Sequence, residues 1–153
     1  MKEIRFFPRH VAEKMKPVEN VGFISFYDKS EAPAILTGWQ KVLRIRCHDK
    51  DEPVLGLEIF NPENAKSVCE FLDQNPDLEA IFVHCSLGQS RSGGMALALS
   101  EFYKVPCFKE NSPVDTFSYK IYNKRIYSLT SQFLRGIEEE SSQSAYEKIF
   151  GSS

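Results

Sequence analysis

The chain has 153 residues and a formal net charge of −2 at neutral pH. This length predicts one domain over residues 1–153 with a sizeable core, and the charge balance gives no basic footprint for nucleic acid or an anionic membrane. No apolar run is long enough to span a membrane, and the N-terminus lacks the apolar stretch of a signal peptide. The four cysteines show no Cys-x2-Cys pairing, which is typical of a reducing compartment, so we expect a cytoplasmic protein.

The first part of the chain alternates short strands with loops and one helix. Four elements are expected there: a strand over 4–7, a helix over 10–16, and strands over 21–27 and 41–46. Pro17 ends the helix, because proline cannot continue it. Arg44 and Arg46 alternate with apolar residues in the third strand and are expected to face solvent, while Trp39 is expected to pack from a short helix.

The second part contains the longer helices. A loop over 47–61 is unusually long and therefore of functional interest. The expected elements after it are a helix from Asn61 to about 74, a strand over 80–83, a helix over 92–103, an irregular stretch over 104–115 and a helix over 116–135. Asn61, Pro62 and Glu63 together favour a helix start. The tail over about 138–153, with a short helix around 145–150, is expected to be flexible or to dock.

Strands that alternate with helices indicate an α/β fold. We expect a mostly parallel sheet of four or five strands, flanked by helices. In such open sheets, ligands bind beyond the carboxyl ends of the strands. Cys85 follows the strand over 80–83 and therefore lies at that edge.

The stretch His84 to Ser92, HCSLGQSRS, combines a cysteine at a strand end with an arginine at a helix start. The loop between them contains no proline and no acidic residue. Its backbone N–H groups and the helix N-terminus are suited to hold a dianion. Arg91 offers a planar, two-pronged contact to phosphate oxygens. The same positive field favours the nucleophilic thiolate of Cys85.

This His-Cys-x5-Arg-Ser pattern resembles the signature of the cysteine-dependent protein phosphatases, and in its HCxxGxSRS form most closely the dual-specificity branch. The resemblance implies a phosphatase-like fold, no cofactor, and catalysis through a cysteinyl-phosphate intermediate. It assigns Cys85 as nucleophile, Arg91 as phosphate and transition-state ligand, Ser92 as hydrogen-bond donor to the sulfur, and His84 as a support of the loop. The phosphate would be bound by the backbone amides of Ser86, Leu87, Gly88, Gln89, Ser90 and Arg91.

The reaction also needs an acid to protonate the leaving oxygen. In the phosphatases that the chain resembles, this acid is an aspartate on a loop after an upstream strand. The matching stretch here favours Asp49, with Asp51 second and Glu52 a distant third. A metal site built from Cys47, His48, Asp49 and Asp51 is disfavoured, because transfer through a thiolate requires no metal.

The expected substrate is a phosphorylated protein or peptide, with phosphotyrosine first and with phosphoserine or phosphothreonine also admitted by a shallow pocket. No nucleic-acid or membrane partner is expected. Several alternatives stay open. They are a phosphatase acting on a phosphoinositide, an RNA 5′-phosphate or a nucleotide; a rhodanese-type sulfurtransferase; and a non-catalytic module that binds phosphopeptides. The absence of lysine from positions 86–90 argues against phosphoinositides and RNA 5′-triphosphate.

Overall fold

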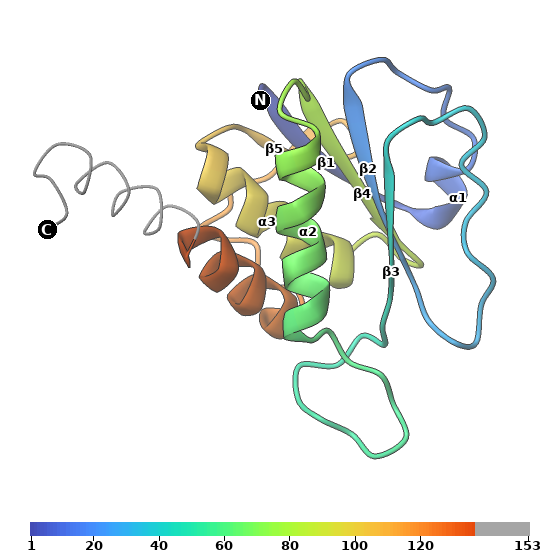
Figure 1. Cartoon of the computed structure of the whole chain (residues 1–153), viewed down its shortest axis with the longest axis vertical. Helices are drawn as coiled ribbons and strands as arrows, with labels where there is room; N and C mark the ends of the chain where they lie inside the picture. Colours follow the sequence, from blue (N-terminus) through green and yellow to red (C-terminus); the bar gives the residue numbers. More distant parts are fainter. Residues whose placement is uncertain (137–153) are drawn as a thin grey trace, which may run out of the picture.

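A computed structural model describes residues 1–136 and has an α/β architecture built on one mixed sheet of six strands (Figure 1). The strands are β1 (Glu3–Pro8), β2 (Val21–Tyr27), β3 (Val42–Arg46), β4 (Ala80–Cys85), β5 (Cys107–Lys109) and β6 (Ser112–Pro113). The helices are α1 (Arg9–Ala12), α2 (Pro62–Gln74), α3 (Arg91–Tyr103) and a last helix over 124–136. The predicted α/β class is confirmed.

The sheet has the order β3-β2-β4-β1-β5-β6, and every neighbouring pair is parallel except β5 with β6. The predicted number of four or five strands was too low. The short strands β5 and β6 lie in the stretch 104–115 that the sequence indicated to be irregular. The two prolines in this stretch argued against a strand, but β5 and β6 lie at the edge of the sheet, where proline is tolerated.

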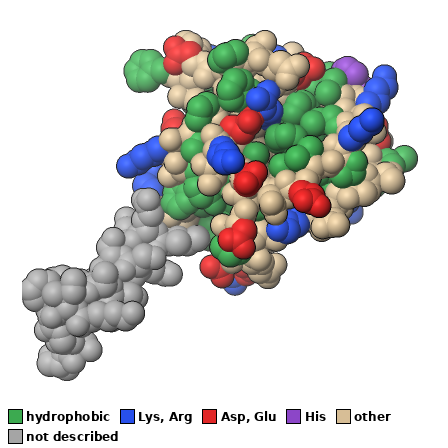
Figure 2. Space-filling model, turned by 90° about the horizontal axis from the view of Figure 1, so that it is seen from above, with side chains coloured by type: hydrophobic (Ala, Val, Ile, Leu, Met, Phe, Trp, Pro, Cys, Tyr) green, Lys and Arg blue, Asp and Glu red, His purple; other side chains and the backbone are tan. Residues whose placement is uncertain are grey.

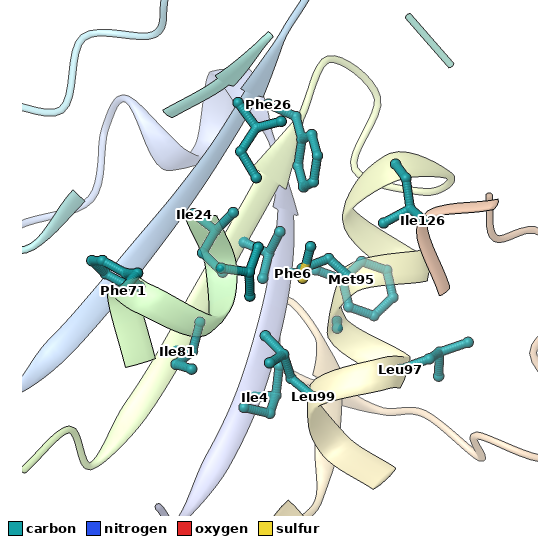
Figure 3. Packing of buried hydrophobic residues seen from close by; sticks show 14 of the residues in the cluster. Ile4, Phe6, Ile24, Phe26, Phe71, Ile81, Met95, Leu97, Leu99 and Ile126 are labelled. Carbon is teal, nitrogen blue, oxygen red and sulfur yellow. The ribbon is translucent and has the colours of Figure 1, made fainter. Parts of the chain in front are cut away.

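Alternating residues of the central strands supply two separate cores, one on each face of the sheet. Phe6, Ile24 and Ile81 point into the larger core, where α2, α3 and the last helix cover the sheet (Figures 1 and 3). Phe7 and Phe23 point to the opposite face and pack with Phe82, Trp39 and Ala12 of α1. This period of two is the expected geometry of a strand covered on both faces.

Helix α2 begins as the sequence predicted. The side chain of Asn61 accepts a hydrogen bond from the backbone N–H of Asn64, and the side chain of Asn64 accepts one from the Asn61 N–H. Pro62 occupies the first turn, where its missing N–H costs nothing, and Glu63 lies in that turn as well. The start of the helix was therefore fixed by local chemistry.

The first and last helices are shorter than predicted. Helix α1 covers Arg9–Ala12 instead of 10–16. Pro17 drives the residue before it out of the helical region. A helix this short also has few backbone hydrogen bonds that could extend it toward the proline. The last helix begins at 124 instead of 116. Trp39 packs against Phe23 from a turn, not from the expected short helix.

The carboxyl ends of β1, β2, β3 and β4 bring several loops to one edge of the sheet. The loop over 47–61 projects from this edge beyond the end of β3 (Figure 1). Within residues 1–136, no helix is both long and apolar enough to cross a membrane. The tail over 138–153 and its predicted helix lie outside the described residues.

Candidate active site

Strand β4 ends at Cys85 and helix α3 begins at Arg91, so the loop between them joins a central strand to a buried helix. The Cys85 side chain is nearly buried, and its Sγ lies 3.2 Å from the Ser92 Oγ. Ser90 precedes α3 without capping its backbone N–H groups by a side-chain hydrogen bond. The start of α3 is therefore left without the usual side-chain acceptor, close to the thiol.

Gly88 lets this loop lie directly on the end of β1. Its backbone has a φ of +67°, and a Cβ placed there would meet the Pro8 nitrogen at 2.2 Å. The Arg9 N–H donates to the Ser86 carbonyl at 3.3 Å. The loop is thus supported from below by the junction of β1 and α1, and only glycine fits at this point of contact.

Arg91 is 5% exposed, and its guanidinium contacts residues that follow the ends of β2, β3 and β4. Nη1 donates to the Cys47 carbonyl at 2.8 Å, just past β3, and Nη2 donates to the Ser86 Oγ at 3.0 Å. The carboxylates of Asp28 and Glu31, in the loop after β2, lie 3.8 and 3.7 Å from these two nitrogens. The arginine is therefore held at the loop and does not extend into solvent.

Asp49 lies next to the loop between Cys85 and Arg91, called the cysteine loop below, whereas Asp51 forms a hydrogen bond outside it. The Asp49 Oδ1 accepts hydrogen bonds from the Ser90 Oγ at 2.7 Å and from the Asn123 Nδ2 at 2.9 Å. The Asp51 Oδ1 instead accepts from the Lys124 backbone N–H at 2.9 Å, at the start of the last helix. Glu52, the third candidate, is exposed. Of the three acids, Asp49 is the one hydrogen-bonded to the loop.

Two histidines flank the site in structural positions. His84 is fully buried, its Nε2 lies 2.6 Å from the Ser25 Oγ, and burial lowers its pKa to about 4. The ring is therefore neutral at neutral pH, and it lies directly before Cys85. His48 closes the long loop over 47–61, since its Nδ1 accepts from the Glu58 N–H at 3.1 Å.

The sequence analysis did not predict two pairs of residues that lie in the site. Asp28 and Glu31 stood in a stretch that looked like an ordinary polar loop; the available signal was that a loop after a parallel strand leaves at the ligand-binding edge. Tyr119 and Asn123 were placed inside the predicted helix over 116–135. Their real positions depend on contacts with the cysteine loop.

Those contacts explain why the last helix starts late. The Tyr119 hydroxyl donates to the Gln89 carbonyl at 2.8 Å, and the Asn123 N–H donates to the Ser90 carbonyl at 2.9 Å. The Asn123 Oδ1 also accepts from the Ile126 N–H at 2.9 Å, as a helix-capping asparagine does. Asn123 thereby joins the loop that carries Asp49, the cysteine loop and the last helix.

All four cysteines are buried. All four thiols are free. Burial raises the pKa of Cys47 and of Cys107 to about 12, so both remain protonated at neutral pH. Among residues 1–136, no group of three or more His, Cys, Asp or Glu side chains is placed to hold a metal ion.

The surface seen in Figure 2 carries acidic, basic and apolar side chains side by side, without an extended area of one charge. Comparisons of the chain with protein-family models, with curated protein sequences and with solved structures found no match.

Proposed function

We propose that this chain is a cysteine-dependent phosphatase that hydrolyses phosphomonoesters through a cysteinyl-phosphate intermediate. The observation that carries the proposal is the meeting of four groups at one loop. Cys85 lies 3.2 Å from the Ser92 hydroxyl, Arg91 is folded onto the same loop, and Asp49 is hydrogen-bonded to Ser90. A nucleophile, an anion ligand and an acid are thus within reach of one bound phosphate.

In the first step, the Cys85 thiolate attacks phosphorus in line with the leaving oxygen. The sulfur–phosphorus bond forms as the phosphorus–oxygen bond breaks, and Asp49 gives its proton to the departing oxygen. Arg91 and the N–H groups at the start of α3 neutralise the charge on the equatorial oxygens. The uncapped helix start suits this role, because a side-chain acceptor would compete with the phosphate.

In the second step, water attacks the phosphorus of the intermediate. The Asp49 carboxylate takes a proton from that water, the sulfur–phosphorus bond breaks, and the thiolate of Cys85 leaves. A hydrogen bond from the Ser92 hydroxyl, 3.2 Å from the sulfur, stabilises the departing thiolate. Inorganic phosphate is then released and the site returns to its starting state.

The proposed substrate is a phosphorylated protein or peptide. The loop positions Ser86, Leu87, Gln89 and Ser90 carry no charge, and the guanidinium of Arg91 already has two carboxylates nearby. Additional phosphate groups on a substrate would find no further cation within the loop. This favours a single phosphomonoester, with phosphotyrosine as first choice and phosphoserine or phosphothreonine as further substrates.

The proposal is tested by replacing the nucleophile. Cys85→Ser should abolish release of phosphate from para-nitrophenyl phosphate and from a phosphotyrosyl peptide, because a hydroxyl is hardly ionised at neutral pH. It should still bind inorganic phosphate, since the loop amides and Arg91 remain. Cys69→Ser, at a buried cysteine on α2, serves as the matched control and should retain turnover.

Phosphate binding and sulfur transfer are checked in the same series. Arg91→Lys should lose most of both phosphate binding and turnover, because one ammonium cannot make the two-pronged contact. Substantial hydrolysis by Cys85→Ser would contradict a covalent mechanism. Transfer of sulfur from thiosulfate by the wild-type protein, without release of phosphate from any ester, would favour a sulfurtransferase instead.

A further inference from the structure

Two carboxylates lie beside the buried Arg91 and are not used by the proposed chemistry. Both come from the loop after β2, which leaves the same edge of the sheet as the cysteine loop. The Asp28 Oδ2 is 3.8 Å from Nη1 of Arg91, and the Glu31 Oε1 is 3.7 Å from Nη2. All three side chains are largely shielded from water, at 6%, 19% and 21% exposure, so these charges are only partly screened.

Glu31 connects the arginine to two other parts of the site. Its carboxylate accepts from the Ser86 Oγ at 2.9 and 3.0 Å, and Ser86 is also the acceptor for Nη2 of Arg91. It further pairs with Arg9 at 3.6 Å, at the start of α1. One carboxylate therefore contacts Ser86 of the cysteine loop, Arg91, and Arg9 in the segment on which that loop rests.

Asp28 and Glu31 are themselves held in place. The Asp28 N–H donates to the Glu31 Oε1 at 3.1 Å, and the Ser30 N–H donates to the Asp28 Oδ1 at 2.8 Å. The hydrogen bonds from Ser30 lower the pKa of Asp28, and the positive charge of Arg91 acts in the same direction. The Asp28 carboxylate is therefore charged at neutral pH, with its Oδ2 on the side of the arginine.

We propose that Glu31 and Asp28 are positioning residues that align the Arg91 guanidinium for the transition state of phosphoryl transfer. This inference rests on the proposed phosphatase function. A guanidinium has N–H groups in a fixed planar fork. Contacts to Cys47, Ser86 and the two carboxylates fix the terminal nitrogens, and with them the plane that presents the remaining N–H groups to phosphate.

The carboxylates have opposite effects on ground state and transition state. Two negative charges near the loop repel a bound dianion, which weakens ground-state binding. A correctly oriented guanidinium matters most when the equatorial oxygens reach their transition-state positions. Removing one carboxylate should therefore lower kcat and also lower KM, because less negative charge then repels the bound dianion. Simple loss of folding would lower the active fraction without changing KM.

The test is Glu31→Gln, which keeps an oxygen acceptor for Ser86 but removes the charge. We expect kcat for para-nitrophenyl phosphate to fall about tenfold, with a smaller KM and tighter inhibition by inorganic phosphate. The decrease should be the same for a phosphotyrosyl peptide, because arginine alignment does not depend on the leaving group. Asp28→Asn, which alters only the 3.8 Å pair to Nη1 among the contacts to Arg91, should reduce kcat about threefold.

Glu13→Gln is the matched control. Glu13 also pairs with Arg9, at 3.3 Å, and accepts from the Ile35 N–H, but it makes no contact with Arg91 or Ser86. It should leave kcat unchanged. A kcat for Glu31→Gln and Asp28→Asn within twofold of wild type would overturn the positioning role while the phosphatase assignment stands. Absence of hydrolysis by wild type and Glu13→Gln alike would instead overturn the proposed function and this inference with it.

Discussion

For single residues, the proposed phosphatase function requires a carboxyl group that donates a proton, and Asp49 is the candidate hydrogen-bonded to Ser90. Asp49→Ala should slow hydrolysis of a phosphotyrosyl peptide on the order of 10²–10⁴-fold. It should slow an activated aryl phosphate considerably less, because a good leaving group needs little protonation. Steady-state rates across a series of aryl phosphates measure this, and the mutant should show the steeper dependence on the leaving group. The alkaline limb of its pH–rate profile should disappear as well.

Asp51→Ala is the control for that experiment. Its Oδ1 accepts from the Lys124 N–H at the start of the last helix, so its loss should cost about 1 kcal/mol of stability, as for other helix caps. The leaving-group dependence should stay as in wild type. The reverse pattern in the two variants would make Asp51 the acid, and an unchanged dependence in both would place the donor outside this loop.

Among the elements, the cysteine loop depends most on one glycine. Gly88 and Gly56 both have positive φ, at +67° and +83°, but only Gly88 lies against other atoms. Gly56→Ala should lower the free energy of unfolding by about 1 kcal/mol, because alanine is strained in the left-handed conformation. Gly88→Ala should cost about 3 kcal/mol or more, because its Cβ would meet the rigid backbone of Phe7 and Pro8 at 2.4 and 2.2 Å. Urea unfolding of both variants measures the difference.

Gly88→Ala should also lose phosphate binding, since the loop must lift off β1 to accommodate the methyl group. A variant that folds with wild-type stability and binds inorganic phosphate normally would show that the loop does not rest on β1 as described. Gly56→Ala should bind phosphate as wild type does. The comparison separates backbone strain from steric conflict. Both glycines have a positive φ, but only at Gly88 would a Cβ collide with other atoms.

For the entire folded chain, buried His84 makes stability depend on pH. Its pKa is lowered from 6.5 to about 4 by burial. The unfolded chain therefore takes up this proton at a higher pH than the folded chain, and acidification through this window favours unfolding. The free energy of unfolding should fall by about 1.5 kcal/mol between pH 6.5 and pH 5.

Urea titrations at the two pH values measure this effect. Glu13, Asp28 and Glu58 have lowered pKa values, so their contribution is lost only at lower pH. His84→Gln should be less stable at pH 7, because it disturbs the bond to Ser25, but it should lose the decline between pH 6.5 and pH 5. The same decline in this variant would assign it to another group.

Features that depend on neighbouring residues could be predicted from the sequence. The strand over 21–27 follows from its apolar run, and the start of α2 follows from Asn61, Pro62 and Glu63. The change from strand to loop to helix between His84 and Ser92 follows from nine consecutive residues. Such signals depend on residues close together in the sequence, so they do not require knowledge of the tertiary contacts.

Features that depend on the order of strands could not be predicted in this way. Glu31 meets Ser86, and Asn123 meets Asp49, because β2 and β4 are adjacent in the sheet and the last helix packs on that same core. The last helix starts at 124 because Tyr119 and Asn123 form hydrogen bonds with the cysteine loop. Contacts between residues 55 to 74 positions apart leave no local pattern in the chain, so the surroundings of Arg91 and Asp49 emerge only when the sheet has assembled.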